Sequence, residues 1–457
     1  MNNGSRPTHY SLFITQTGSR PNSQFSINMS LLQKLIHQPL ARQSGTLLSG
    51  QVVAQGIALL AYLVLGRLFT PADMGLYNIF YSYIEVLIIL STCKYELAIV
   101  VAESDSEAQH IARLTLRLNT IVSLVILTVA LVLYLTHTAV SQLPPSLALL
   151  IPPMVYFCGT TRVYTFLSNR SKDFRGISIS NIITSASGVA AKILMGLAAL
   201  ASTFSSFLHT YGLPLGTVLG KVAGNIYYRL RVPAPRISPD DTTSHRALLH
   251  KHRNFPLFAM PKEFVSSFSA NLPFLWAAAY FDSAAIGLFG MALTFSMRPI
   301  NILANSFESV FYASCSDKLH SHQPIGRDIR RFLLLLNAVA VPVGVLAFFA
   351  AEPLFVFFIG PKWVGTGYYF RCLLPWMLVL LSVNSLSFVA NIFSTQRYDF
   401  GFQLLQLALR VVALLIGIHR ADIRLAVLLF AAASTLVQLC QLLCYLLQIR
   451  HYDRAAQ

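Results

Sequence analysis

Charged residues are scarce in this sequence. Only 11% of its 457 residues are Asp, Glu, Lys or Arg, whereas 55% are hydrophobic and the mean hydropathy is +0.59. Soluble domains carry roughly 25% charged residues. A chain with less than half that share cannot cover its surface with hydrated groups. The composition therefore excludes an ordinary soluble protein and predicts one embedded in a bilayer.

Cysteine motifs and long polar segments are also lacking. The chain has six cysteines, and none of them forms a Cys-x-x-Cys pair. Cys440 and Cys444 are one helical turn apart but have no further ligands at the spacing of a metal site. The longest internal polar interval, 229–254, is too short to bury a core of its own. We therefore expect no disulfide, no metal, no cofactor, no soluble catalytic domain and no enzymatic activity.

Acidic residues are the scarcer charge. The chain has 18 Asp and Glu against 34 Lys and Arg, which gives a net charge of +16. A nucleic-acid-binding surface would gather the basic residues on one face, but here they stand in short clusters between long apolar runs. Such clusters fix the topology of membrane proteins, so we expect no nucleic-acid partner.

Apolar stretches of about twenty residues, the length that crosses a ~30 Å hydrocarbon core, follow one another along the chain. They predict an all-α polytopic membrane protein with about twelve transmembrane helices; because the stretch at 401–418 is short, eleven is the alternative. The expected helices lie near 44–66, 76–101, 113–136, 144–167, 176–200, 205–228, 257–280, 285–311, 331–351, 368–393, 401–418 and 423–448.

Lysine and arginine in the connecting segments indicate the orientation. With the N-terminus in the cytoplasm, the inside segments hold about 23 of these residues and the outside segments about 4, an asymmetry that follows the positive-inside rule. The outside residues are Arg67, Lys362, Arg420 and Arg424. We therefore expect a multi-pass protein of the bacterial inner membrane with both termini in the cytoplasm.

The expected organisation has five parts. Residues 1–43 form a polar, partly disordered cytoplasmic segment, and 44–228 form an N-terminal six-helix bundle. A cytoplasmic linker at 229–254 leads to a C-terminal six-helix bundle at 255–450 and a tail at 451–457. Met29 opens a short basic amphipathic segment, so a second hypothesis is that residues 1–28 are not translated.

Short matches between the two halves indicate an internal repeat. The stretch from Phe69 to Tyr77 matches Phe281 to Phe289 at an offset of 212, with Gly75 on Gly287, and the same offset brings Glu96 onto Glu308. Six helices separate the copies, so the halves share one orientation and are related by a pseudo-two-fold axis along the membrane normal. Parallel repeats are typical of alternating-access transporters; duplication that merely enlarged the protein is the alternative.

Five ionisable residues fall inside the expected helices, where a charge costs about 2.5–3.5 kcal/mol on insertion scales. If they face a water-filled cavity, the four cations make it electropositive and suited to a diphosphate, which Arg would hold in bidentate fashion. Glu85 could pair with Arg298 or carry a coupling proton; otherwise each charge simply pairs or snorkels. These candidate substrate-binding residues are Arg298, Glu85, Lys192, Arg410 and Lys221.

Glycines recur at every fourth position of the sixth expected helix. Residues on this spacing form one smooth ridge against which a neighbouring helix can pack closely. We interpret the ridge as a packing surface, with a sliding or gating surface as the alternative. It comprises Gly212, Gly216, Gly220 and Gly224.

Two segments resemble the polysaccharide-export flippases of bacteria. The sequence GRLFTPADMGLYNIFYSYIEVLIILSTCKYELAIVVAESDSEA contains a Phe-x-Pro-x-Asp-x-Gly turn and a Tyr-Glu-x-Ala-Ile stretch like those around the second helix of that family. NFPLFAMPKEFVSSFSANLPFLWAAAYFDSAAIGLFGMALTFSMRPINI is similar to the seventh and eighth helices, with Phe-Pro at its start and Arg298-Pro299 within the eighth. Only Arg298 among the candidate charges lies in a matching motif.

The resemblance implies Wzx-like flippases of the multidrug/oligosaccharidyl-lipid/polysaccharide exporter superfamily. Their substrate is a polyprenyl-diphosphate-linked sugar repeat unit for O-antigen, capsule or exopolysaccharide, and the implied partners are a polysaccharide polymerase and chain-length proteins. Three rivals stand beside it. A cation-coupled drug exporter favours acidic cavity residues, a polymerase or glycosyltransferase favours a large outside loop or clustered acids, and a structural membrane protein needs no duplicated halves.

Overall fold

The structure is a computed structural model, and it describes residues 39–139, 142–201, 203–233, 235, 245–320, 323–393 and 395–455. The chain divides into two compact units, residues 1–45 and 46–457. The expectations for residues 1–28 and for a start at Met29 lie outside the described residues, as do the side chain of Glu308 and the linker from 236 to 244.

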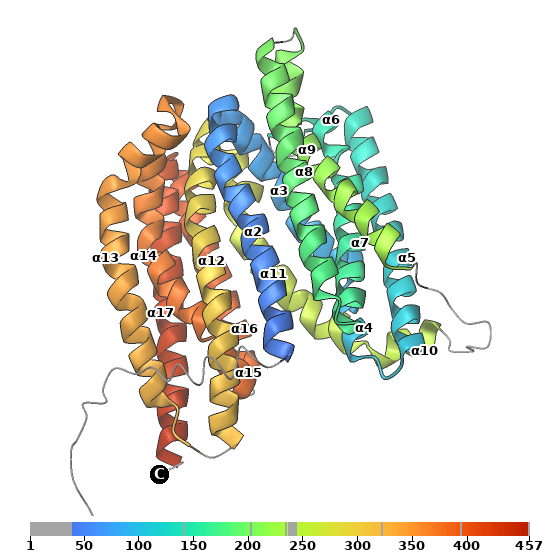
Figure 1. Ribbon diagram of the computed structural model, residues 1–457. Coiled ribbons are helices and arrows are strands. Elements are labelled where there is room, and N and C mark those ends of the chain that lie inside the picture. The colour runs from blue at the N-terminus through green and yellow to red at the C-terminus, as the bar shows by residue number, and fades with distance from the viewer. Residues whose placement is uncertain are drawn as a thin grey trace, which may run out of the picture. The chain divides into compact units, whose positions relative to one another are not determined.

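In the described part of the chain, twelve long helices follow one another, joined by shorter helical segments. They alternate in direction, so that each one begins at the end where the previous one stops (Figure 1). The helices are α2 (Pro39–Leu68), α3 (Pro71–Thr92), α5 (Asp105–Leu135), α7 (Ile151–Arg170), α8 (Phe174–Ala201), α9 (Ser205–Arg231), α11 (Met260–Leu275), α12 (Ser283–His320), α13 (Gly326–Ile359), α14 (Thr366–Ser385), α16 (Gln396–His419) and α17 (Ile423–Ala455).

The shorter segments lie at the helix ends. They are η1 (Tyr95–Leu97), α4 (Ala98–Val101), α6 (Pro145–Ala148), α10 (His245–Lys251), η2 (Phe255–Ala259), η3 (Ala277–Ala279), η4 (Pro361–Trp363) and α15 (Phe388–Ile392). Among them η2 is one turn of π-helix that leads directly into α11. Single π-helical turns frequently occur at functional sites.

Each of the twelve predicted spans coincides with one of these helices, which confirms the all-α polytopic fold. In the described part of the chain, 10 spans are long and apolar enough to cross a membrane. The remaining two helices are α9, whose glycines and polar side chains lower its hydropathy, and α11, which has 16 residues.

Local sequence explains where α3 begins. Thr70 caps the helix: its hydroxyl accepts a hydrogen bond from the Asp73 amide, and the Asp73 carboxylate accepts one from the Thr70 amide. Pro71 occupies the first helical position, where its missing N–H costs nothing. The Phe-x-Pro-x-Asp-x-Gly motif is therefore a capping box that turns the chain sharply from α2 into α3.

The second unit has two ends with different charge. At one end α3, α7 and α9 stop and α11, α13 and α16 begin; we call it the basic end, and the other one the opposite end. The basic end carries Lys94, Arg170, Lys172, Arg175, Arg229, Arg231, Lys251, Arg253, Arg327, Arg330 and Arg331. In Figure 1 it lies at the bottom of the view.

The helices of the second unit gather in two groups, visible in Figure 1. The N-terminal group contains α3, α5, α7, α8 and α9, and its tightest pair is α8 with α9. The C-terminal group contains α12, α13, α14, α16 and α17, in which α14 packs against α12, α13 and α17. Contacts of α3 with α11 and α12 join the groups.

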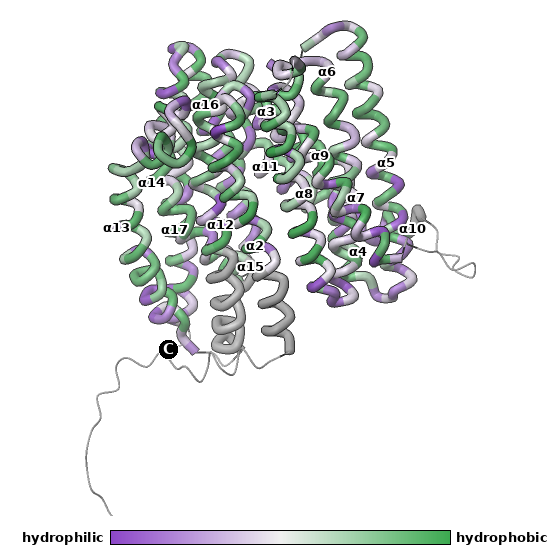
Figure 2. Tube along the Cα trace, turned by 45° about the horizontal axis from the view of Figure 1, so that its top comes forward, coloured by the Kyte–Doolittle hydropathy of each residue, from purple (hydrophilic) through white to green (hydrophobic). Residues whose placement is uncertain are grey.

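Apolar side chains cover the outside of the second unit. Figure 2 shows hydrophobic residues along most of α5 and α13, with hydrophilic ones gathered toward the helix ends. Large side chains such as Val129, Leu334 and Leu346 are more than half exposed. Contiguous apolar surface of this extent is typical of contact with lipid.

The buried core differs between the two ends. Toward the opposite end, one cluster combines residues of both groups, such as Phe80 and Leu147 with Phe289 and Trp363. Toward the basic end, the described residues form two separate clusters. One belongs to the N-terminal group and includes Tyr164 and Tyr228; the other belongs to the C-terminal group and includes Phe388 and Tyr445. Among the residues whose side chains the structure describes, the two groups thus share a core toward the opposite end and have separate cores toward the basic end.

A pair of repeat-related glycines lies at this junction. A β-carbon on Gly75 would meet the Ser283 carbonyl oxygen at 1.9 Å, and one on Gly287 would meet the Pro71 carbonyl oxygen at 1.8 Å. The four residues obey the offset of 212 found in the sequence, so the contact is symmetric. Only glycine permits the backbones of α3 and α12 to approach so closely.

Hydrogen bonds from α2 to α13 and η4 reinforce the opposite end. The indole of Trp363 donates to the Gly66 carbonyl oxygen at 2.7 Å, and the Lys362 ammonium donates to the Arg67 carbonyl oxygen at 2.9 Å. The Arg67 guanidinium in turn donates to the carbonyl oxygens of Phe357 and Phe358. These bonds fasten the end of α2 to α13 and η4.

Candidate substrate cavity

Two polar pockets flank α11. One, which we call pocket N, has a volume of about 380 Å³ and is lined by α3, α7, α9 and α11. The other, pocket C, has a volume of about 610 Å³ and is lined by α11, α12, α14, α16 and α17. Ser267 of α11 lines pocket N, whereas its neighbour Ser266 lines pocket C, so the two pockets are adjacent.

Charged groups of both signs line pocket N. Glu85 and Lys221, both predicted cavity residues, face it together with Arg162 and Glu263. The Glu85 carboxylate accepts a hydrogen bond of 2.9 Å from the Asn271 amide, whose helix also touches the Glu85 backbone through Ser267. Glu85 therefore holds α11 against α3.

Two ion pairs border pocket N on the side of the basic end. Arg162 lies 3.6 Å from the Glu96 carboxylate, which is 1% exposed. Lys94 lies 3.3 Å from Glu263 across the boundary between α3 and α11. Arg162 and Glu263 line the pocket, and their partners Glu96 and Lys94 lie beside it; none of these four residues was among the charges predicted for the cavity.

Lys192 and Arg298 lie deeper, near the shared core. The Lys192 ammonium donates to the Tyr77 hydroxyl at 3.1 Å and lies over the Tyr77 ring, 4.7 Å from its centroid. Arg298 lies over the Tyr62 ring at 5.2 Å. Such cation–π contacts stabilise a charge without neutralising it.

Tyr77 links α3 to α8 and α9. Thr217 of α9 also donates to the Tyr77 hydroxyl, at 3.1 Å, beside the bond from Lys192. Among the contacts of the described residues, Lys192 is the predicted charge that touches Tyr77, whereas Arg298 lies over Tyr62 and Glu85 and Lys221 face pocket N.

Arg410, the fifth predicted charge, lies apart from the others in pocket C. It is 3% exposed, and its guanidinium donates to the hydroxyls of Ser434 at 2.9 Å and Ser269 at 3.1 Å. The rings of Phe430 and Trp376 cover it at 4.4 and 4.9 Å. Among the described residues no carboxylate lies within ion-pair distance of Arg410.

The four glycines of α9 are all buried against other helices. Gly216, Gly220 and Gly224 lie against Lys192, Gly188 and Thr184 of α8, and Gly212 lies against Met195 of α8 and Phe69. A β-carbon on Gly216 would meet the Lys192 side chain at 2.5 Å. The glycine ridge therefore positions the helix that carries Lys192.

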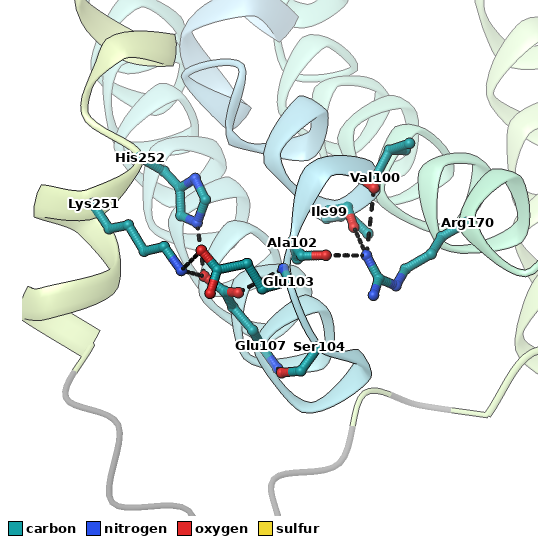
Figure 3. A network of polar contacts seen from close by, with 9 residues as sticks. All are labelled: Ile99, Val100, Ala102, Glu103, Ser104, Glu107, Arg170, Lys251 and His252. Atoms are coloured by element: carbon teal, nitrogen blue, oxygen red, sulfur yellow. Dashed lines mark hydrogen bonds and ion pairs between the residues drawn. The ribbon is translucent and has the colours of Figure 1, made fainter.

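Figure 3 shows how the segment before α11 is tied to the N-terminal group. The Lys251 ammonium lies 2.8 Å from Glu107 and 3.0 Å from Glu103, and the His252 ring lies 3.0 Å from Glu107. The two carboxylates raise the pKa of the Lys251 ammonium above its usual value. These contacts fix the start of η2 and α11 beside α5.

Arg170 performs a similar task within the N-terminal group. Its guanidinium donates to the carbonyl oxygens of Ile99 and Ala102 (Figure 3). It also pairs with Asp105 at 2.9 Å. It thereby satisfies the carbonyl groups at the end of α4, which a helix end leaves unpaired. Arg170 thus holds the bends between α3 and α5 in place at the basic end.

The family can be identified from the sequence model that matches residues 64–368, described as polysaccharide biosynthesis protein. The match covers more than half of the chain. The chain belongs to this family. No curated protein is significantly similar to it in sequence.

Solved structures of transporters share the fold. An inward-facing multidrug-resistance MATE family transporter of the MOP superfamily has a TM-score of 0.65 and 14% identity, over 88% of this chain and 96% of that chain. The lipid II flippase MurJ, in an inward closed conformation, has a TM-score of 0.67 and 13% identity over 91% and 90%. An outward-facing MATE family transporter has a TM-score of 0.52 and 13% identity over 92% and 98%. This chain therefore has the fold of MOP-superfamily transporters.

Proposed function

We propose that this protein is a flippase that moves polyprenyl-diphosphate-linked oligosaccharide repeat units from the inner to the outer leaflet of the bacterial cytoplasmic membrane. The family membership links the chain to polysaccharide biosynthesis. The fold is that of membrane transporters, and one solved structure with this fold is a lipid II flippase.

The observation that carries the proposal is the unequal joining of the two helix groups. They share one hydrophobic core at the opposite end and have separate cores at the basic end. Both polar pockets lie next to α11, pocket N on the side of the N-terminal group and pocket C on the side of the C-terminal group, and residues of the shared core line part of each. A transporter that admits its substrate from one side requires this asymmetry, and the higher TM-score with the inward-facing transporter agrees with it.

The polar interior suits a charged, hydrated head group. Hydroxyls and phosphates cannot cross hydrocarbon unaided, because each unsatisfied polar group costs several kcal/mol. Lys192 at Tyr77, Arg298 at Tyr62 and Lys221 in pocket N supply cations for the two phosphates, and within the described structure the Lys192 ammonium contacts a tyrosine hydroxyl and ring and has no acidic partner. The prenyl chain stays in lipid while the head group crosses.

The basic end faces the cytoplasm in this proposal, so that the pockets receive a substrate assembled inside the cell. Release on the other side requires the shared core to separate and the bonds from Trp363 and Lys362 to break. A polysaccharide polymerase and chain-length proteins would then consume the product at the outer leaflet.

A reconstituted assay tests the proposal. Proteoliposomes containing the full chain and a fluorescent polyprenyl-diphosphate oligosaccharide are treated with an impermeant quencher that reaches only the outer leaflet. We expect the protected fraction to fall faster with the protein than in empty liposomes, and to fall at the empty-liposome rate for Arg298→Ala. Equal rates with and without the wild-type protein contradict the proposal.

A second candidate is a cation-coupled multidrug exporter, which the fold shared with MATE family transporters favours. Glu85 and Glu263 face pocket N and supply the acidic groups that cationic drugs need. The alternative predicts that expression of the protein lowers the accumulation of a cationic dye such as ethidium in cells that lack other exporters, and that Glu85→Gln removes this effect.

A further inference from the structure

Pocket C contains polar atoms that the transport of a diphosphate does not explain. The indole Nε1 of Trp376 and the Oε1 atoms of Gln403 and Gln438 are buried and have no hydrogen-bond partner in the described structure. Trp376 is 4% and Gln438 is 8% exposed. Leaving a buried donor or acceptor unpaired is costly, and all three line the same pocket.

The pocket offers donors and acceptors in similar measure. Arg410 and the indole of Trp376 donate, while the Gln403 and Gln438 amide oxygens accept. The Asp399 carboxylate also accepts, from the Tyr445 hydroxyl at 2.9 Å. Primary amides present both kinds of group whichever way they are turned.

This mixture excludes several occupants. An ionised phosphate accepts hydrogen bonds but donates none, so it could pair with Lys262 and Arg410 but would leave the unpaired oxygens of Gln403 and Gln438 without a donor and would be repelled by the Asp399 carboxylate. A metal ion or an organic cation would meet Arg410, which already lacks a carboxylate partner among the described residues. An apolar group would leave the amides unpaired. Hydroxyl groups, which donate and accept at once, match the pocket.

We propose that pocket C binds sugar residues of the transported head group. The inference rests on the proposed function and deepens it, because it assigns the neutral, hydroxyl-rich part of the substrate to the C-terminal group and leaves the diphosphate to Lys192, Arg298 and Lys221. The volume of pocket C, about 610 Å³, lies within the ~300–1,000 Å³ that is usual for small-ligand sites. Trp376 contributes a flat apolar edge beside the hydrogen-bonding groups, as ligand sites with a few placed polar groups do.

The helix spacing explains how the pocket forms. Gln403, Gln406 and Arg410 follow one another at three and four residues on α16, so they share one face of that helix. Gln438, Gln441 and Tyr445 repeat the same spacing on α17. The two polar stripes meet in pocket C. Six polar side chains gathered on one face of each of two mainly apolar helices are costly in a bilayer unless they serve a ligand.

A binding experiment with matched lipids tests this inference. The full chain in nanodiscs is titrated with polyprenyl diphosphate and with the same lipid carrying N-acetylglucosamine, galactose or glucose. We expect the wild type to bind at least one sugar-bearing lipid tighter than the sugar-free lipid. Gln438→Leu and Trp376→Phe should each reduce that preference roughly five- to tenfold, the worth of a hydrogen bond to a ligand.

Two control variants lie outside pocket C. Gln448→Leu changes a glutamine of the same helix, α17, and Trp276→Phe changes a tryptophan at the end of α11; both should keep the preference. Unchanged affinity for the sugar-free lipid shows that the test variants are folded. If Gln438→Leu loses affinity for the sugar-free lipid, the sugar preference of Trp376→Phe tests the inference instead.

The outcomes separate the two proposals. If the wild type binds the sugar-free lipid but shows no preference for any sugar, or if both variants keep the preference, pocket C is no sugar site and the flippase proposal stands. If the wild type binds none of these lipids, the proposed function fails and the inference with it.

Discussion

The symmetric glycine contact at the opposite end gives a sharp test of alternating access. In Gly75→Ala, the new β-carbon would lie 1.9 Å from the Ser283 carbonyl oxygen. Since non-bonded heavy atoms prefer separations of at least about 3.5 Å, α3 and α12 must part by about 1.5 Å. Overpacking of this kind costs about 1–3 kcal/mol.

That cost falls only on the conformation in which the opposite end is closed. An open conformation separates the two helices and accommodates the methyl group, so the population open to the outside rises by roughly 5- to 150-fold. Gly287→Ala should give the same shift, because its β-carbon would meet the Pro71 carbonyl oxygen at 1.8 Å.

Labelling of a reporter cysteine measures the shift. Ser267→Cys, in pocket N, is introduced into a chain whose native cysteines are replaced by serine, and an impermeant maleimide is added to right-side-out vesicles. The initial labelling rate from outside should rise with either glycine variant. Gly56→Ala and Gly401→Ala are matched controls, because a β-carbon at these glycines has no atom within 4 Å. Equal labelling rates in all five proteins would refute the reasoning.

Three further predictions concern charges. Arg298→Ala should abolish glycan export without lowering the level of the protein in the membrane, and export at the wild-type rate contradicts the role of the cation over Tyr62. Arg410→Met should leave the melting temperature in detergent unchanged or raised, because a buried cation without an acidic partner stabilises little, while binding of the sugar-bearing lipid falls; a large drop in melting temperature would instead assign Arg410 a structural role. Asp173 lies 2.7 Å from Arg231, and this hydrogen-bonded partner lowers the pKa of the carboxyl. The ion pair therefore stabilises the fold above the unfolded pKa of about 3.9, and this stabilisation is lost as the pH falls through the folded pKa. Asp173→Asn should cost less than ~1 kcal/mol of stability at neutral pH and nothing in strong acid. Thermal melts of both proteins at the two pH values measure the difference.

The fold could be predicted from the sequence because bilayer thickness imposes a length on every span. All twelve apolar stretches became helices, including the short one that forms α16. The repeat offset of 212 also identified residues that meet in space, since Gly75 and Gly287 pack against the matched positions Ser283 and Pro71. Such a prediction needs only that both copies fold alike.

The candidate site was only partly visible in the sequence. Charged residues in apolar runs are conspicuous, and of the five predicted ones Glu85 and Lys221 line pocket N, Arg410 lines pocket C, and Lys192 and Arg298 lie over the rings of Tyr77 and Tyr62. Arg162 was missed because it lies near a helix end and resembles a topology charge. The neutral amides of pocket C were missed because a single glutamine in a helix carries no signal; the stripes on α16 and α17 become apparent only when their spacing of three and four residues is read together.

The distances between these groups could not be predicted from the sequence, for a physical reason. Helix periodicity fixes which residues share a face, but the rotation of each helix and the choice of its neighbours depend on packing throughout the bundle. The suggestion that Glu85 pairs with Arg298 illustrates this: Glu85 accepts from Asn271 of α11, and Arg298 lies over Tyr62 of α2. The partners of Glu85 and Arg298 were therefore determined by which helices pack against α3.

The leaflet in which lipid-linked oligosaccharide accumulates tests the central claim most directly. Spheroplasts of cells that lack this protein are probed with an impermeant sugar-binding lectin before and after permeabilisation. A flippase predicts that the oligosaccharide is reached only after permeabilisation, and that restoring the protein exposes it on the intact surface. Oligosaccharide that is fully exposed on intact spheroplasts without the protein would contradict the account.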